Sequence, residues 1–252
     1  MRAVGIIPSR WGSTRLPGKS LVALCGKSLV QRVYERACAA KRLDAVLVAT
    51  DDERIVAAVT AFGGNVVLTR ADHPSGTDRI AEAVQGQEAD VVVNIQGDEP
   101  LLDPGLIDQL VERMRQEPDW DMGTAVSPWL DKEELVNPSV VKAVFGANGQ
   151  ALYFSRSVIP FNRDGDELEG ADGRPLYWRH IGLYAYRRAF LARLVAEAPC
   201  AMEMAEKLEQ LRALHLGGRM FVVESDAVAI GVDTPADVEK VEARIREQEQ
   251  NG

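Results

Sequence analysis

Short apolar runs alternate with amphipathic stretches along the first half of the chain. The runs at residues 3–7, 45–49 and 90–95 are mostly apolar and rich in β-branched residues, which is typical of strands buried on both faces. Residues 27–41 instead repeat their apolar side chains at the spacing of one helical face. The pattern predicts strands over residues 3–7, 45–49, 66–68 and 90–95, and helices over 27–41, from the capping box Thr50–Glu53 to Gly63-Gly64, over 77–84, and from Pro104 to Met114.

Strands that are apolar throughout and are separated by helices predict an α/β fold with a mostly parallel, doubly wound, Rossmann-like sheet. In such sheets, ligands bind beyond the carboxyl ends of the strands. The loops that follow Ile7, Ala49, Leu68 and Ile95 are therefore the places where we expect the chemistry.

The pattern changes between about residues 121 and 186. Strand-like runs come close together there, and a polar stretch at 162–174 predicts a loop. The runs are 122–126, 140–145 and 151–154, with a hairpin turn at Asn148-Gly149. We interpret this section as a smaller β-rich insertion that acts as a lid or forms a dimer contact. The remaining predicted elements are helices over 187–197 and 203–214, a strand over 219–224 and a last helix capped by Thr234-Pro235, so we expect one domain over residues 1–252.

The charge balance narrows the function classes. The 252 residues include 29 Lys and Arg against 38 Asp and Glu, a formal net charge of −9. No global positive field therefore attracts nucleic acid or anionic lipid. An acidic protein that binds a polyanion must gather its cations locally, which makes any tight basic cluster informative.

Cysteine usage and hydropathy indicate the compartment. Cys25, Cys38 and Cys200 are too few and too scattered for a disulfide framework or a zinc site, and an odd number fits a reducing compartment. No run approaches the ~20 apolar residues of a membrane span. The apolar stretch at residues 3–7 is too short for a signal peptide. We therefore expect a cytoplasmic protein without membrane contact.

The loop after the first strand, residues 8–19, concentrates positive charge. Arg10, Arg15 and Lys19 stand there together with Gly12 and Gly18. Glycines let backbone N–H groups approach oxygen anions, while Arg and Lys side chains neutralise them. The loop fits neither the Walker A nor the dinucleotide-binding glycine pattern. A solvated basic loop is the alternative, but such a concentration of cations in an acidic chain favours a phosphate site.

Two carboxylates are candidates for binding a hard cation. Asp98 follows the most apolar strand, in the crevice where the basic loop is also expected, and Mg²⁺ takes one or two carboxylates together with phosphate oxygens. Asp98 could instead cap the turn into the next helix. Asp233 lies directly before Thr234-Pro235 and is explained equally well as part of a helix start.

Seven ordered motifs span residues 1–240. They are Arg10 with Ser13–Lys19, Ser75–Arg79, Asn94–Pro100, Tyr153–Arg156, Arg179–Tyr184, Leu208–Arg212 and Gly231–Pro235. In this order they resemble the motifs of CMP-Kdo synthetases, the 3-deoxy-manno-octulosonate cytidylyltransferases. CMP-sialic acid synthetases share the fold, but their loop has a Ser-Lys-Gly core where this chain has Ser13-Thr14-Arg15. Trp11 stands where the family varies, and the polar loop at 162–174 varies in length.

The resemblance implies how the nucleotide and the metal are held. Arg10, Arg15 and Lys19 would bind the triphosphate of CTP, and Asp98 with Asp233 would bind Mg²⁺. Arg15, Lys19 and Asp98 would be the catalytic residues.

The resemblance also implies two further subsites. The cytosine pocket would be lined by Ser75, Thr77 and Arg79, for which a plain helix start is the alternative. Six polar residues would surround the acidic sugar: Gln96, Arg156, His180, Tyr184, Glu209 and Gln210. Taken singly, His180 is equally well a core histidine and Glu209 a solvated helix position.

Together these implications predict a homodimeric nucleotidyltransferase that moves CMP from CTP to the anomeric hydroxyl of Kdo, with release of pyrophosphate, for lipopolysaccharide biosynthesis. Such a transfer needs positioning and charge neutralisation rather than a side-chain nucleophile. One alternative is a cytidylyltransferase for another acidic sugar, 8-amino-Kdo or a sialic acid, because sugar selectivity depends on a few polar groups. The other is a non-catalytic nucleotide-sensing module, which has little reason to keep both Asp98 and Asp233.

Overall fold

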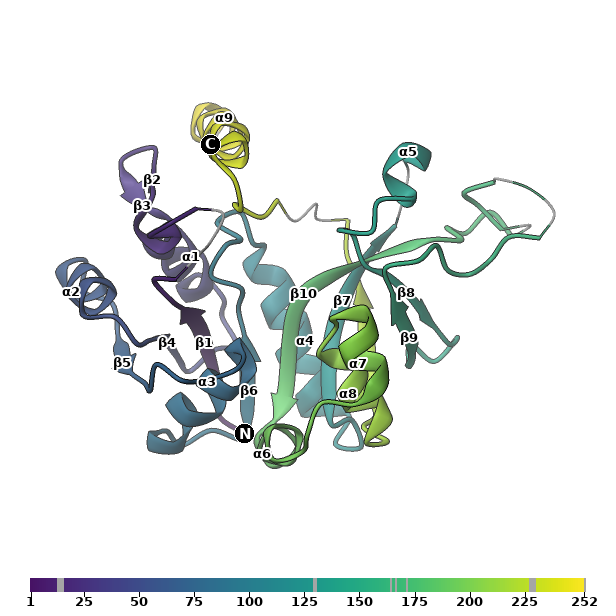
Figure 1. Cartoon of the computed structure of the whole chain (residues 1–252), viewed down its shortest axis with the longest axis horizontal. Helices are drawn as coiled ribbons and strands as arrows, with labels where there is room; N and C mark the ends of the chain where they lie inside the picture. The colour runs from purple at the N-terminus through teal and green to yellow at the C-terminus, as the bar shows by residue number, and fades with distance from the viewer. Residues whose placement is uncertain are drawn as a thin grey trace. The chain divides into compact units, whose positions relative to one another are not determined.

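The computed structural model describes residues 1–12, 16–128, 131–163, 165, 167–170, 172–226 and 230–251 (Figure 1). The chain divides into two compact units. The first unit joins Met1–Glu112 to Ala229–Gly252, and the second unit is Arg113–Val228. A single domain over residues 1–252 stays a prediction, because compactness does not measure whether a unit folds on its own.

Parallel strands form the sheet of the first unit. They are β1 (Ala3–Ser9), β4 (Ala45–Thr50), β5 (Val66–Leu68) and β6 (Val91–Asn94), in the order β6-β1-β4-β5. The pairings are parallel, with Val4 of β1 opposite both Ala45 and Val92. The four predicted strands are confirmed. The strand order reverses between β1 and β6, which is the position at which such sheets bind ligands.

Complete burial explains why these strands read as uniform apolar runs. Val4, Ile6 and Ile7 of β1 and the three valines of β6 have no exposed surface. Because successive strand residues point to opposite faces, both faces of this sheet are covered. A strand with two covered faces needs apolar side chains at every position rather than at alternate ones.

Helices of the first unit begin at side-chain caps. Their bounds are α1 (Leu29–Cys38), α2 (Glu53–Ala61), α3 (Gly76–Ala83) and α9 (Pro235–Asn251), with α4 (Pro104–Gln116) spanning the boundary of the units. Ser28, Asp52 and Ser75 cap α1, α2 and α3 by accepting backbone hydrogen bonds. The predicted helices are confirmed, but Asp52 caps α2 in place of Thr50, the first residue of the predicted capping box.

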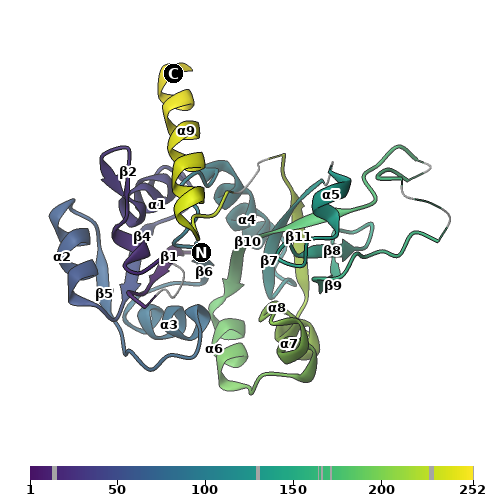
Figure 2. The ribbon, with the colours of Figure 1, turned by 45° about the horizontal axis from the view of Figure 1, so that its top comes forward.

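The helix predicted from residue 27 begins two residues later. Lys27 and Ser28 form β3 (Lys27–Ser28), which pairs with β2 (Ala23–Leu24) in a small hairpin. Helix α9 lies beside this hairpin and α1 (Figure 2), where the backbone N–H of Cys25 donates to Glu242 at 2.8 Å. The C-terminal helix thus belongs to the first unit, although residues 113–228 separate it in the sequence from the rest of that unit.

A mixed sheet forms the second unit. Its strands are β7 (Met122–Pro128), β8 (Lys142–Phe145), β9 (Ala151–Ser155), β10 (Trp178–Arg187) and β11 (Met220–Glu224). Strand β7 pairs antiparallel with β10 and parallel with β11, while β8 pairs antiparallel with β9 and β10. The predicted hairpin is confirmed, since Gly149 at its turn has a φ of 76°. Strand β10 was not predicted, because Arg179 and His180 interrupt its apolar alternation.

The helices of the second unit correct one prediction. They are α5 (Lys132–Leu135), α6 (Arg188–Ala196), α7 (Ala201–Glu206) and α8 (Gln210–His215). The single helix predicted over 203–214 is wrong, because Lys207 adopts a left-handed conformation with a φ of 55° and ends α7. The predicted loop at 162–174 lies partly outside the described residues. Within the part of the chain that the structure describes, no helix is long and apolar enough to cross a bilayer.

Candidate functional site

A cavity of ≈ 560 Å³ opens at the carboxyl ends of the first unit's strands, a volume typical of small-molecule sites. The loops after β1 and β6, the segment that starts α3 and the residue before Thr234 line it. Seven residues singled out from the sequence contribute to this lining: Arg10, Lys19, Ser75, Arg79, Gln96, Asp98 and Asp233. A smaller cavity of ≈ 380 Å³ lies in the second unit, and none of the predicted site residues lines it among those described.

Close backbone approach shapes the floor of this cavity. A Cβ atom at Gly97 would lie 2.8 Å from the carbonyl oxygen of Pro8. Only glycine therefore lets the loop after β6 pass this close to the end of β1. The contact brings the basic loop and Asp98 to the same place at the point where the strand order reverses.

Lys19 joins the two candidate carboxylates. Its Nζ lies 2.8 Å from Oδ2 of Asp98 and 2.9 Å from Oδ1 of Asp233, with all three side chains only partly exposed. Burial alone would lower the pKa of Lys19, but the charges and hydrogen bonds of Asp98 and Asp233 outweigh it and raise that pKa above its ordinary value. Lys19 is therefore a cation between two carboxylates that are far apart in the sequence.

Other residues cap the helix that follows Asp233. The Thr234 hydroxyl accepts a hydrogen bond from the backbone N–H of Asp237 at 3.3 Å, and Asp237 Oδ2 accepts from the N–H of Thr234 at 2.9 Å. This reciprocal pair is a capping box. Asp103 accepts from the backbone N–H of Gly105 at the start of α4. Capping therefore explains neither the Asp233 carboxylate nor the Asp98 carboxylate.

The carboxylate pair fits the requirements of a divalent cation. One ammonium group already reaches both carboxylates at hydrogen-bond distance, so a small cation can do the same. No group of three or more Asp, Glu, His or Cys side chains suited to a metal occurs among the described residues. Mg²⁺ is usually held by one or two carboxylates and completes its shell with substrate phosphates and water. The donor set is thus suited to a metal that arrives with a nucleotide rather than to a closed structural site.

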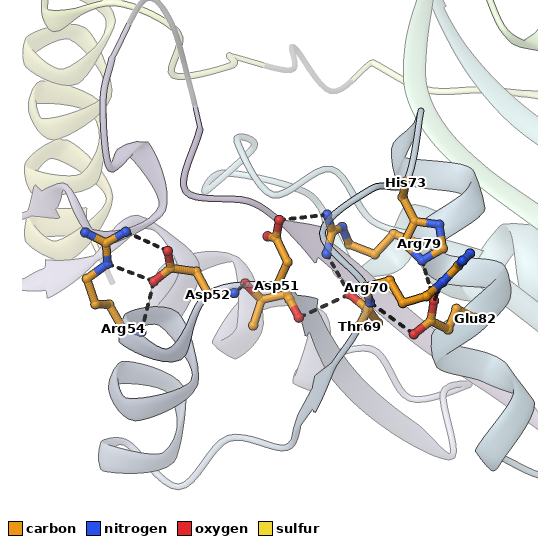
Figure 3. Close-up of polar contacts among 9 residues, drawn as sticks. Asp51, Asp52, Arg54, Thr69, Arg70, His73, Arg79 and Glu82 are labelled. Atoms are coloured by element: carbon orange, nitrogen blue, oxygen red, sulfur yellow. Dashed lines mark hydrogen bonds and ion pairs between the residues drawn. The ribbon is translucent and has the colours of Figure 1, made fainter.

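The described ends of the basic loop are fixed by aromatic stacking. Trp11 packs against Gly18, where a Cβ atom would lie 3.0 Å from the indole, and Gly18 has a φ of 66°. The guanidinium of Arg54 stacks 3.5 Å from the centroid of the Trp11 ring. Asp52 holds Arg54 through two hydrogen bonds of 2.8 and 2.6 Å (Figure 3). Arg15 lies outside the described residues.

The wall of the cavity at α3 contains predicted nucleotide residues. The Ser75 hydroxyl accepts from the backbone N–H of Asp78 at 3.2 Å and donates to its carboxylate at 2.7 Å. Arg79 is 4% exposed, and its guanidinium contacts Thr69 and Asp51 (Figure 3). Thr77 is buried and is not one of the described residues that line the cavity.

His180 and Tyr184 lie together in the second unit, on β10. Nε2 of His180 lies 2.9 Å from the hydroxyl of Thr124, and its ring packs edge-on against Phe154 and next to Tyr184. Burial lowers the pKa of His180 to about 3. The imidazole is therefore neutral near pH 7 and can donate or accept one hydrogen bond at each nitrogen according to its tautomer.

Arg156 is tied to backbone carbonyls near Glu209 and Gln210. Its guanidinium donates to the carbonyl oxygens of Glu206 at 2.7 Å and Pro138 at 2.8 Å, and its own carbonyl accepts from the buried ammonium of Lys142. The Glu206 contact lies at the end of α7, directly before the turn that carries Glu209 and Gln210. Of the six predicted sugar residues, Gln96 lines the cavity of the first unit and the other five belong to the second unit.

Sequence reasoning missed the polar residues behind the α3 wall. Asp51 and Thr69 each follow a strand of the parallel sheet, in the loops where ligands were expected, yet neither was singled out. His73, which also lines the cavity, was not singled out either, and its Nε2 lies 2.5 Å from Glu82. The available signal was position, since a polar residue directly after a parallel strand lies at the ligand edge of the sheet.

Comparison with known proteins assigns the family. A family model described as cytidylyltransferase matches residues 4–221. The chain belongs to the cytidylyltransferase family. It is 48% identical to the 3-deoxy-manno-octulosonate cytidylyltransferase of Geobacter sulfurreducens over 250 residues, which covers 98% of this chain and 100% of the relative. The corresponding enzyme of Trichlorobacter lovleyi is 46% identical over 251 residues, covering 98% of this chain and 100% of that relative.

Solved structures agree with this assignment. A CMP:2-keto-3-deoxy-manno-octonic acid synthetase complexed with CTP matches with a TM-score of 0.92 and 43% identity, covering 98% of this chain and 100% of that one. A cytidylyltransferase of Leptospira borgpetersenii shares the fold, with a TM-score of 0.66 at 16% identity, covering 98% of this chain and 87% of that one. The Rossmann-like nucleotidyltransferase fold expected from the sequence is confirmed.

Proposed function

We propose that this protein transfers CMP from CTP to the anomeric hydroxyl of 3-deoxy-D-manno-octulosonate, giving CMP-Kdo and pyrophosphate for lipopolysaccharide biosynthesis. The observation that carries the proposal is the meeting of Lys19, Asp98 and Asp233 in one cavity at the reversal of strand order. Full-length relatives at 46–48% identity, which are named for this activity, support the choice of substrates.

The nucleotide would lie along the cavity. Arg10, Arg15 and Lys19 supply the positive charge for the triphosphate, which an acidic protein must gather locally. Ser75, Thr77 and Arg79 belong to the wall or the helix behind it and would bind cytosine. Arg10 and Lys19 lie in the loop after β1, and Arg79 lies on α3, so phosphates and base would meet different parts of the lining.

Asp98 and Asp233 would hold Mg²⁺ beside the triphosphate. The bound ion would supply neutralisation of the phosphate charge and would lower the pKa of the attacking hydroxyl. The protein's own contribution is to keep the two carboxylates at one point and to place Lys19 between them. Two carboxylates are the kind of ligand that a hard cation such as Mg²⁺ prefers.

The reaction needs no covalent intermediate with the protein. A bond forms between the anomeric oxygen of the sugar and the α-phosphorus of CTP, the bond from that phosphorus to the bridging oxygen breaks, and the hydroxyl proton is released. Arg15, Lys19 and Asp98 act by binding and neutralising charge at this centre. Gln96, Arg156, His180, Tyr184, Glu209 and Gln210 would orient the sugar, with His180 as a neutral hydrogen-bonding group.

We also propose that the protein is a cytoplasmic homodimer. Large apolar side chains are exposed on the second unit, within the section that the sequence pattern predicts to be a lid or a dimer contact. Val136 is 70%, Leu152 is 59% and Phe161 is 86% exposed. Exposed apolar groups of this size are commonly covered by a partner.

Pyrophosphate release measured across nucleotides and sugars tests the proposed reaction. Turnover should require CTP and Kdo together and should fall sharply with UTP, ATP, a sialic acid or 8-amino-Kdo. Faster turnover with 8-amino-Kdo or a sialic acid would show that this sugar, and not Kdo, is the substrate. Tight CTP binding without pyrophosphate release from any sugar would identify a nucleotide sensor instead.

A further inference from the structure

Three polar side chains, those of Arg79, Thr69 and Asp51, contact one another behind the α3 wall of the cavity, and we call this cluster the brace. Nη1 of Arg79 donates to the Thr69 hydroxyl at 2.6 Å, and its Nη2 lies 3.3 Å from Oδ2 of Asp51. The Thr69 hydroxyl in turn donates to the carbonyl oxygen of Thr50 at 3.1 Å. Figure 3 shows Arg79 between Asp51 and Thr69. One helix side chain is thus attached to the ends of two neighbouring strands, β4 and β5.

In the brace, Asp51 and Thr69 hold Arg79 in place. Arg79 is one of the lining residues, whereas Asp51 and Thr69 are not among the described residues that line it. A second contact from the same helix holds the segment before α3, since Glu82 accepts from the N–H of Arg70 at 3.1 Å and contacts His73. The wall is therefore held from behind at two points one helical turn apart.

Asp51 also changes the electrostatic character of this wall. Its Oδ2 lies 3.3 Å from Nη2 of Arg79, so the carboxylate offsets the positive charge of the guanidinium at this part of the cavity. Such a surface suits a neutral base better than a phosphate, which is drawn to the cations of the basic loop. Oδ1 of Asp51 is buried and has no hydrogen-bond partner among the described residues. Leaving a buried acceptor unpaired costs about 1–3 kcal/mol, so packing alone does not account for a carboxylate here.

We propose that Asp51 and Thr69 are positioning residues that orient Arg79 for base selection. The inference rests on the proposed function, because it assumes that a pyrimidine nucleotide occupies the cavity. A guanidinium only donates hydrogen bonds. Cytosine presents O2 and N3 as adjacent acceptors, whereas uracil presents an N3–H donor that leaves a fixed guanidinium donor unpaired. A braced Arg79 favours cytosine, and a loose one can turn away from the mismatch.

Variants of the brace test this proposal. Asp51→Asn and Thr69→Val should raise the KM for CTP about tenfold or more, the factor expected for a hydrogen bond to a charged group, with kcat within about twofold of wild type. The inhibition constant of UTP against CTP should stay unchanged, so the preference for cytosine falls. Thr69→Ser keeps the hydroxyl and should restore the wild-type KM. Inhibition by pyrophosphate should not change, because the basic loop is untouched.

A matched control lies at the other end of β4. Asp44 precedes this strand and accepts from the backbone N–H of Ala3 at 2.7 Å. Asp44→Asn should leave nucleotide selectivity unchanged while making the same chemical change. If Asp51→Asn does not fold, the Thr69→Val and Thr69→Ser pair carries the test.

Two outcomes would overturn the inference. One is unchanged discrimination between CTP and UTP in Asp51→Asn and Thr69→Val, and the other is an equal loss of affinity for CTP, UTP and pyrophosphate, which would mean a general disturbance of the fold. Failure of the proposed function would appear differently, as absent pyrophosphate release by the wild-type protein. In that case calorimetric binding of CTP and UTP to the same variants still decides whether the brace selects the base.

Discussion

At the scale of single residues, the contacts of Lys19 separate charge from helix capping. Thr234 and Asp237 cap α9, so the Asp233 carboxylate is left to face Lys19 together with Asp98. A carboxylate that lies at the ligand edge of a parallel sheet and does not cap a helix is a candidate for binding a ligand or a metal ion.

We expect Asp98→Asn and Asp233→Asn each to lower pyrophosphate release by at least about 100-fold, because an amide is a poor ligand for a hard cation. Thermal unfolding should change little, since neither side chain caps its helix. Asp237→Asn is the control four residues away: it makes the same chemical change in a side chain of the capping box, where an amide oxygen can still accept, and it should retain activity. Activity should disappear with EDTA and return with Mg²⁺. Near-normal turnover of Asp233→Asn at saturating Mg²⁺ would remove that residue from the metal site.

His180 predicts a pH dependence of stability. Burial lowers its pKa from 6.5 to about 3, so between these values the unfolded chain binds a proton that the folded protein does not. The stability that depends on neutral His180 is therefore present above about pH 6.5 and is lost as the pH falls through this window. The contribution lost at pH 5 is about 1–2 kcal/mol. Thermal unfolding at pH 7.5 and at pH 5 measures this effect. Between these two pH values the His180→Gln variant should lose less stability than the wild-type protein, and equal losses would contradict the lowered pKa of His180.

At the scale of elements, one backbone conformation divides a predicted helix. Lys207 ends α7 with a φ of 55° and a ψ of 45°, and α8 starts three residues later. The apolar spacing over 203–214 continues through this break, so periodicity gives no sign of it. The turn brings the carbonyl oxygen of Glu206 to the Arg156 guanidinium, and this tertiary contact stabilises a conformation that lysine does not favour by itself.

We expect Lys207→Gly to leave the melting temperature unchanged or to raise it, because glycine adopts the left-handed region without steric cost. Lys207→Val should destabilise the protein by at least about 1 kcal/mol, since a β-branched side chain is strained there. Differential scanning calorimetry measures both changes. A stable Lys207→Val variant would show that the turn can adopt another conformation.

At the scale of the whole molecule, the proposed homodimer can be tested by measuring the oligomeric state in solution. We expect the wild-type protein to sediment as a dimer, and Phe161→Asp or Leu152→Asp to shift it to the monomer without unfolding, because a buried charge is costly at an apolar contact. Leu68→Asp is the control in the first unit, where the side chain is 55% exposed. A monomeric wild-type protein, or dissociation by Leu68→Asp alone, would place the contact elsewhere or remove it.

The sequence alone determined the parallel sheet and the family. Both depend on local information: strands covered on two faces must be apolar throughout, and seven short motifs in fixed order identify a cytidylyltransferase without any knowledge of their contacts. The sequence pattern did not predict strand β10 or the break at Lys207. Arg179 and His180 interrupt the apolar alternation of β10, and the apolar spacing over 203–214 continues through the turn at Lys207.

Only the tertiary structure decided which polar groups meet. Nothing in the spacing of Asp98 and Asp233 shows that both reach Lys19, or that Arg79 turns inward to Asp51 and Thr69. Hydrophobic periodicity reports which face of an element is buried, and each element carries this information within its own residues. The partner of a charged side chain depends instead on how strands far apart in the chain are ordered in the sheet, and that order is fixed only when the whole core packs.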